Sequence, residues 1–185
     1  IHDFGCFSMG IFLVEGDKYL LDKFNKELYT IPRPLLFENR SKLNPNRQDG
    51  YRLSFHGEKL FNDLVKNGCI PNKSVILEKP KHVPAKLVKY FILGFFDGDG
   101  GANLSSRAIT FTSTKEFCLW IGEFFRDKKI ISNFSVRPCY NGHTYTLYIY
   151  NKKIFNSIYS FFYSDRPFCM TRKRNNLAEL AGIVK

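Results

Sequence analysis

The sequence predicts an α+β fold built from one repeated unit, in which helices alternate with pairs of strands. Three observations predict it. Hydrophobic residues make up 44% of the 185-residue chain, which is enough to form a core. Short segments with strand-like alternation are interleaved with segments of helical periodicity. One strand and the helix after it recur 94 residues later with matching apolar positions, as segments 51–64 and 145–158.

The first half of the chain is expected to hold two helices and two or three strands. Residues 7–14 (FSMGIFLV) are apolar and short, as in a strand, and residues 17–28 place their leucines on one helical face. The proline- and asparagine-rich stretch 32–47 predicts a long loop with one edge strand. Residues 51–56 alternate as a strand, and residues 59–67 predict an amphipathic helix.

The second half is expected to follow a linker and to begin with a helix. Residues 69–84 are rich in proline and lysine, as linkers are, and Pro84 suits the first turn of the helix that follows. Residues 107–113 alternate as a strand. Thr114 is expected to cap a helix over 115–125.

The last third of the chain predicts a hairpin and two more helices. Segments 134–140 and 144–150 are joined by Asn141-Gly142, a strong turn signal for a hairpin. Residues 152–162 have helical periodicity, and the basic cluster 172–174 is expected to precede a last short helix.

Charge and cysteine usage narrow the functional classes. The net charge is +11 and the pI about 9.5, in the range of nucleic-acid-binding domains. Five scattered cysteines without a C-x-x-C pair exclude a disulfide framework and a zinc ribbon, and predict a reducing, intracellular compartment such as cytoplasm, nucleoid or organelle. No apolar run reaches the ~18 residues of a membrane helix, and no cleavable leader opens the chain. Neither a membrane partner nor secretion is expected.

Residues 92–101 (ILGFFDGDGG) place two carboxylates, two positions apart, among glycines at the end of an apolar helix. Gly94 and Gly98 share one helix face, and each costs about 1 kcal/mol relative to alanine in a helix interior. Such glycines occur where another backbone approaches closely. We therefore expect a second helix beside this one, with Phe91 and Phe95 exposed along the shared face. Carboxylates paired at the ends of two helices hold hard cations such as Mg²⁺.

Two other interpretations of the two aspartates do not fit the sequence, and a third remains open. An EF-hand loop starting at Asp97 needs a glutamate at its twelfth position, where Ala108 stands. Nucleotide-binding phosphate loops need glycine spacings and a lysine that this segment lacks. A turn in which Asp97 and Asp99 merely cap the helix end remains open.

The segment and its surroundings resemble the LAGLIDADG family of homing endonucleases. Gly94, Asp97, Asp99 and Gly100 occupy the G, D, D and G of that family's nonapeptide, with Gly98 in its second small position. The linker sequence GCIPNKSVIL is similar to the segment that joins the two halves of single-chain members. The elements expected over the last hundred residues are similar in order to the family's αββαββα repeat.

The resemblance implies the LAGLIDADG homing-endonuclease fold, in which each αββαββα repeat carries a four-stranded antiparallel sheet shaped as a DNA-binding saddle. Residues 1–80 would be a partial first repeat without its acidic helix, and residues 81–185 a complete second repeat. The first motif is expected just before Ile1, and Ile1-His2-Asp3-Phe4-Gly5 does not replace it. A fragment carrying that motif, or a second copy of the chain, is an expected partner, and the chain alone is expected not to cleave DNA as a monomer.

The resemblance also implies roles within the motif. Asp99 is expected to be catalytic and, with Gly98, to bind Mg²⁺, for which Mn²⁺ substitutes. Asp97, Gly94 and Gly100 are expected at structural positions.

Polar residues outside the motif are expected near the acids. By the resemblance, Ser113 organises water there, and Lys173, with Lys73 as its repeat partner, is the basic catalytic residue. In an equally weighted alternative, Arg172, Lys173 and Arg174 form a phosphate-contacting patch without a chemical role.

The family's sheet lies along the major groove, which is wide enough for a two-stranded ribbon. Alternation then predicts which side chains face double-stranded DNA. These are Thr110, Thr112, Ser135, Arg137, Thr144, Thr146 and Tyr148, with Arg107, Arg172, Arg174 and Lys73 as further contacts. The residues expected to face the helices are Ile109, Phe111, Val136, Leu147 and Ile149.

Taken together, the resemblance implies a site-specific double-stranded DNA endonuclease that uses a divalent metal. The alternative is a LAGLIDADG-derived protein that binds DNA or RNA without cutting, as an intron maturase or a regulator. The intact DGDG segment favours the nuclease, whereas the single motif favours the binding protein.

Overall fold

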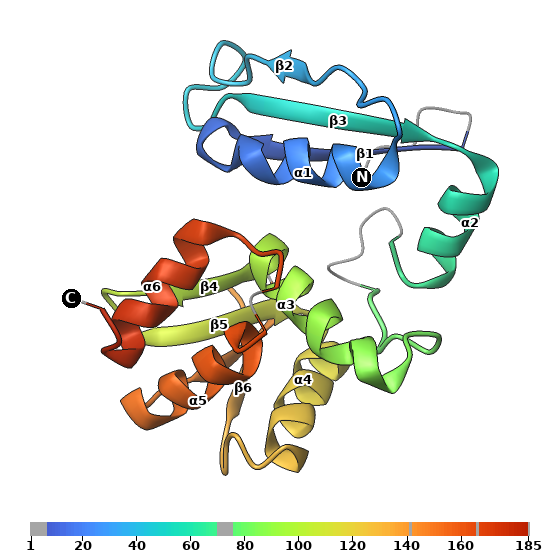
Figure 1. Cartoon of the computed structure of the whole chain (residues 1–185). Coiled ribbons are helices and arrows are strands. Elements are labelled where there is room, and N and C mark those ends of the chain that lie inside the picture. Colours follow the sequence, from blue (N-terminus) through green and yellow to red (C-terminus); the bar gives the residue numbers. More distant parts are fainter. Residues whose placement is uncertain (1–6, 70–75, 141, 166, 185) are drawn as a thin grey trace. The chain divides into compact units, whose positions relative to one another are not determined.

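The computed structural model describes residues 7–69, 76–140, 142–165 and 167–184. The chain forms two compact units, residues 1–71 and residues 72–185 (Figure 1). Within the described ranges, no helix combines the length and the apolar character needed to cross a membrane.

Unit 1 is a three-stranded antiparallel sheet with two helices packed on it. Its described elements are β1 (Ser8–Val14), a 3₁₀ turn (Glu15–Asp17), α1 (Lys18–Leu28), β2 (Leu36–Glu38), β3 (Gly50–His56) and α2 (Glu58–Lys66). The strands lie in the order β1-β3-β2, so the edge strand expected within 32–47 is β2. The buried centre of the unit consists of Met9, Leu21, Leu53 and Phe55.

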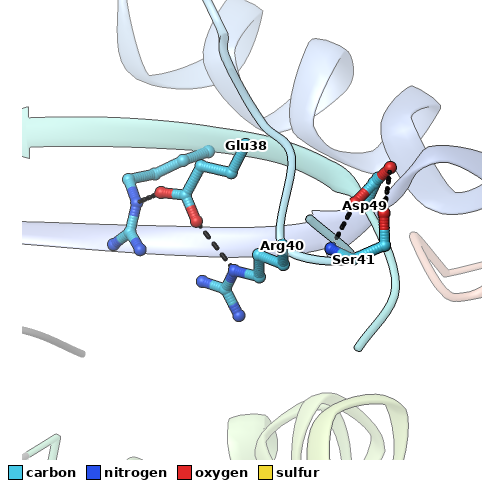
Figure 2. Close-up of polar contacts among 5 residues, drawn as sticks. Glu38, Arg40, Ser41 and Asp49 are labelled. Carbon is cyan, nitrogen blue, oxygen red and sulfur yellow. Dashed lines mark hydrogen bonds and ion pairs between the residues drawn. The ribbon is translucent and has the colours of Figure 1, made fainter. Parts of the chain in front are cut away.

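A group of charged side chains fixes the short strand β2 and the loop after it. Glu38 accepts a hydrogen bond from Nε of Arg40 at 2.8 Å and another from Nε of Arg52 on β3 (Figure 2). The hydrogen bond from Arg52 holds the pKa of Glu38 below its usual value. In the same loop, Asp49 accepts hydrogen bonds from the backbone N–H of Ser41 at 2.8 Å and from its hydroxyl at 3.0 Å.

Unit 2 carries the acidic motif and a four-stranded antiparallel sheet. Its described elements are a 3₁₀ turn (Ala85–Leu87), α3 (Val88–Asp99), β4 (Gly100–Asn103), β5 (Ala108–Ser113), α4 (Lys115–Asp127), β6 (Ser135–Pro138), β7 (Tyr145–Ile149), α5 (Lys152–Tyr163) and α6 (Thr171–Ala181). The strands lie in the order β4-β5-β7-β6. Thr114 caps α4 as predicted, since its Oγ1 accepts a hydrogen bond from the N–H of Phe117 at 3.2 Å. Leu77, which precedes the expected boundary at residue 80, packs in the core of unit 2.

The two faces of the unit 2 sheet differ as the alternation predicts. Ile109, Phe111, Leu147 and Ile149 are fully buried against the helices, in a core rich in phenylalanine. Val136 packs against the same core from the edge strand. The opposite face carries the residues of the other parity, so the sheet presents an apolar side to the helices and a polar side away from them.

The strand–helix segments that recur at 94 residues fold alike. β3 is followed by α2, and β7 by α5. The residue just before the helix has the same unusual backbone in both, with φ 146° and ψ 121° at Gly57 and φ 102° and ψ 122° at Asn151. The order β1-β3-β2 also corresponds to β5-β7-β6. Within the described residues, unit 1 has no counterpart of α3 and β4.

Candidate functional site

The acidic motif forms the last turn of α3. Ile92, Leu93 and Phe96 bury one side of this helix, while Asp99, its last residue, is exposed. The helix ends where the N–H of Gly100 donates to the carbonyl of Phe96 and the chain enters β4. A Cβ at Gly100 would lie 2.6–2.8 Å from atoms of Phe96, so only glycine fits this close approach. The motif thus presents one carboxylate at the junction of helix and sheet.

Asp97 faces the other way and fastens the helix to a distant segment. Its Oδ2 accepts a hydrogen bond from the backbone N–H of Met170 at 2.8 Å. Met170 is the residue before α6, so this bond joins the end of α3 to the start of α6. The contact agrees with the structural role expected for Asp97.

Lys173 makes the second connection between α6 and α3. Its side chain is buried, at 6% exposure, and its Nζ donates to the carbonyl oxygens of Phe96 at 2.7 Å and Gly100 at 2.6 Å. A positive charge there also interacts favourably with the negative end of the helix dipole. Because the ammonium is buried on these carbonyls, Lys173 offers neither the phosphate contact of the alternative nor the accessible basic group expected of a catalytic residue.

The basic cluster 172–174 was expected to precede the last helix, but it lies within the first turn of α6. Helical geometry turns Lys173 inward, and its neighbours Arg172 and Arg174 are exposed. The two arginines therefore remain candidates for phosphate contacts. Lys73 lies outside the described residues.

Ser113 lies on the helix-facing side of β5, with Ile109 and Phe111. Its side chain is 1% exposed, and its Oγ has no hydrogen-bond partner among the described residues. This burial disagrees with the expectation that Ser113 organises water near the acids. The residue of open-face parity at this end of β5 is Thr112, whose Oγ1 lies 2.8 Å from Oγ1 of Thr146.

Strand register gathers the residues predicted to face DNA into two rows across the sheet. Thr112, Thr146 and Arg137 form the row nearer the end of α3. Thr110, Tyr148 and Ser135 form the second row, farther from it.

The predicted contact residues differ in how available they are. Thr146 is 7% exposed and also contacts Sγ of Cys139, at 3.2 Å, and Thr144 is 8% exposed. Arg137 is exposed and donates through Nε to Oγ of Ser135 at 3.1 Å. Arg107 is exposed in the turn between β4 and β5, with φ 48°. The exposed side chains of Arg107 and Arg137 are therefore more accessible to a ligand than the buried Thr144 and Thr146.

Comparison with known proteins gives a likeness of fold. No protein-family model matches the sequence, and no curated protein matches it. A solved structure does match, described as the crystal structure of the I-LtrWI LAGLIDADG homing endonuclease bound to target DNA. The match has a TM-score of 0.59 at 12% sequence identity and covers 95% of this chain and 78% of that one.

The chain folds like a LAGLIDADG homing endonuclease. At this sequence identity the likeness concerns the fold, which is mixed α+β with antiparallel sheets. The assignment of individual residues therefore depends on the geometry of this chain.

Among the described residues, helix α3 has one face that no other element covers. Leu87 and Tyr90 are 43% and 42% exposed, and a Cβ built on Gly94 or Gly98 would meet nothing within 4 Å. This face differs from the expected one, because Phe91 and Phe95 pack inward. Both contact the ring of Phe117 on α4, with centroids 6.3 Å and 4.7 Å away. The two glycines thus have open space beside them.

The residues at the end of α3 fit a magnesium ion bound mainly by oxygen atoms outside the protein. Mg²⁺ usually takes one or two carboxylates and fills its shell with water and phosphate oxygens. Asp99 supplies one exposed carboxylate, and the last carbonyls of a helix, including that of Gly98, lack helical partners. In the described part of the chain, no group of three or more His, Cys, Asp or Glu side chains is placed to hold a metal.

Tyr163 is a further titratable group near the motif that the sequence analysis did not single out. Burial raises the pKa of its phenol far above the usual value, and nearby Asp97 adds to the rise. The phenol therefore stays neutral at physiological pH. A neutral phenol cannot serve as a base. The sequence carries no signal for this, because the burial of Tyr163 depends on how α5 packs.

Proposed function

We propose that this chain is a site-specific double-stranded DNA endonuclease that hydrolyses phosphodiester bonds with Mg²⁺ at Asp99. The observation that carries the proposal is the exposed carboxylate at the end of α3, where the helix meets the first strand of a sheet with a polar open face. The likeness of fold to a DNA-bound homing endonuclease and the net charge of +11 support the same substrate class.

Each part of the site has a distinct task in this proposal. The open face of the sheet enters the major groove, and its exposed arginines contact phosphates and base edges. Asp99 and the Gly98 carbonyl hold the metal, which when bound supplies Lewis-acid activation of water and of the leaving oxygen. Lys173 and Asp97 hold the end of α3, so that the Asp99 carboxylate is presented in one orientation.

A second motif helix is part of the proposal. The exposed face with Gly94 and Gly98 suits a helix that approaches backbone to backbone, from a second copy of the chain or from a separate fragment. Such a partner would bring a second carboxylate beside Asp99. Cutting both DNA strands requires two such sites.

The test is cleavage of a library of randomised DNA duplexes with Mg²⁺, by the full chain alone and with a motif-bearing partner. The matched pair of variants is Asp99→Asn and Asp127→Asn, because both aspartates are exposed last residues of helices. With the motif-bearing partner we expect cleavage by the wild type and by Asp127→Asn, and binding without cleavage by Asp99→Asn; the monomeric chain alone should bind without cleaving. Full cleavage by Asp99→Asn would remove this carboxylate from the mechanism.

A second candidate function is nucleic-acid binding without cleavage. The observation that favours it is the single carboxylate at the helix end, with no larger ligand cluster in the described residues. In that case wild type and Asp99→Asn would bind duplexes or structured RNA equally well, and neither would cut with or without a partner.

A further inference from the structure

A hollow of about 390 Å³ lies at the outer edge of the unit 2 sheet. Its walls come from the segment before β6, from the end of β7 and from the start of α5. Among its lining residues are Asn133, Arg137, Tyr148, Tyr150 and Asn151. None of these belongs to the acidic motif.

Flat side chains follow one another along this hollow. The rings of Tyr148 and Tyr150 are parallel, with an angle of 2° between their planes and 6.0 Å between their centroids. The guanidinium carbon of Arg137 lies 5.7 Å from the centroid of Tyr148. Arg137 is registered with Thr146, so it lies on the side of Tyr148 away from Tyr150. Tyr150, 46% exposed, is the outer end of this stack.

The surroundings of the stack are basic and polar. Lys153 is exposed at the start of α5, a helix of 12 residues whose N-terminal end favours negative charge. Exposed Asn133 and Ser132 offer an amide and a hydroxyl beside the rings. A ring face, hydrogen-bonding groups and positive charge together match the base, the base edge and the phosphate of one nucleotide.

We propose that this hollow holds a single unpaired nucleobase, stacked on Tyr150, with its phosphate near the start of α5. Bases within a duplex offer only their edges to a groove, because neighbouring bases cover their faces. An exposed tyrosine face is therefore matched by a base that has left the stack, as in other aromatic platforms. The proposal rests on the proposed function and adds a feature of the DNA that the protein recognises.

The hollow is separate from the end of α3. Gly100, Phe111 and Leu147 lie side by side on β4, β5 and β7, and Tyr150 lies three residues after Leu147, just past the end of β7. With a rise of about 3.3 Å per residue and about 4.8 Å between strands, Tyr150 is roughly 14 Å from the start of β4. Substitutions in the hollow therefore leave Asp99 unchanged.

The test measures binding of the full chain to a labelled DNA hairpin duplex in three forms. One is fully paired, one carries a single unpaired adenine, and one carries an abasic nucleotide at the same place. We expect the unpaired adenine to bind about 5- to 150-fold more tightly than the abasic form. Tyr150→Ala should remove this preference and Tyr150→Phe should keep it. Tyr140→Ala is the matched control, because Tyr140 is fully exposed before the hairpin turn and does not line the hollow.

Each outcome bears on one proposal. Equal binding of the adenine and abasic forms by the wild type, with the paired hairpin still bound, would overturn the base site and leave the proposed function standing. Binding of the unpaired adenine without any binding of the paired hairpin would support the base site and contradict the duplex endonuclease. If the same unpaired adenine binds more tightly in an RNA hairpin than in the DNA hairpin, the proposal that the base comes from DNA is overturned. Thermal unfolding of each variant, expected to match the wild type, shows that the effect is one of binding.

Discussion

Replacing Lys173 by methionine removes one buried positive charge while keeping a long, unbranched side chain. In the wild type the ammonium donates to the carbonyls of Phe96 and Gly100. After the change the Phe96 oxygen keeps the N–H of Gly100, whereas the Gly100 oxygen loses its lysine donor. We expect unit 2 to lose stability and the end of α3 to fray.

The size of the effect follows from the two interactions lost. Depriving a buried carbonyl of a hydrogen bond costs about 1–3 kcal/mol. Loss of a charge that complements a partly buried helix end costs up to about 2 kcal/mol more. The free energy of unfolding should therefore fall by about 1–5 kcal/mol. For a unit of this size, that lowers the Tm by about 4–20 °C.

The assay combines thermal unfolding with the salt dependence of DNA binding. Arg172→Met is the matched control. It also removes one positive charge, but from an exposed side chain at the neighbouring position. We expect Arg172→Met to unfold within about 0.5 kcal/mol of the wild type. If Arg172 contacts a phosphate, its replacement should lower by about one the slope of the logarithm of the DNA-binding constant against the logarithm of the salt concentration. Lys173→Met should instead lose stability and leave the salt dependence of binding unchanged.

A different pattern would refute the reasoning. If Lys173→Met unfolds like the wild type and lowers the salt slope, then the ammonium contacts phosphate in solution and the buried position is wrong. Lys173→Arg adds a second check. Its larger guanidinium cannot occupy the same 6% exposed position unchanged, so we expect a stability between those of wild type and methionine variant.

Three further predictions concern charge and packing. Glu38→Gln should destabilise unit 1 by about 1–3 kcal/mol at pH 7, because it weakens the bonds from Arg52 and Arg40. Because the pKa of Glu38 is lowered, the wild type has extra stability above pH 4.5, and this stability is lost as the pH falls through the lowered pKa. The free energy of unfolding should therefore fall less with decreasing pH in the variant than in the wild type. Gly94→Ala should stabilise the chain by about 1 kcal/mol in thermal unfolding, since its Cβ meets nothing, yet weaken association with a motif-bearing partner in sedimentation. Duplex affinity should fall roughly 10³–10⁵-fold between 50 and 200 mM salt if ~6–10 phosphates are contacted, and a flat titration would contradict a DNA-binding surface.

Local patterns were enough to predict most of the elements of this fold. Alternation in β5 and β7 correctly assigned Ile109, Phe111, Leu147 and Ile149 to the helix side, because a strand with one buried face must alternate. The same parity rule places Ser113 inward. The signal that would have corrected its assignment was therefore present in the sequence.

The contacts of Lys173 could not be read from local sequence. Its cluster shows three adjacent positive charges, and nothing in that pattern distinguishes the buried one from its exposed neighbours. The distinction arises because α6 packs against the end of α3, 77 positions earlier in the chain. The expectation that Phe91 and Phe95 are exposed on α3 is wrong for the same reason. Phe91 and Phe95 are covered by Phe117 on α4, which no periodicity within α3 reveals.

The spacing of the two aspartates explains why a single motif gives half a site. Residues two apart on an α-helix are separated by about 200° around its axis, so Asp97 and Asp99 project to opposite sides. Asp97 accordingly turns toward the start of α6, where it accepts the N–H of Met170, and Asp99 is exposed. One such helix can therefore anchor itself with one carboxylate and offer the other to a cation, but it cannot supply a pair. In the proposed function, the second carboxylate of a two-metal arrangement would come from another helix, and the glycine face of α3 leaves room for one beside Gly94 and Gly98.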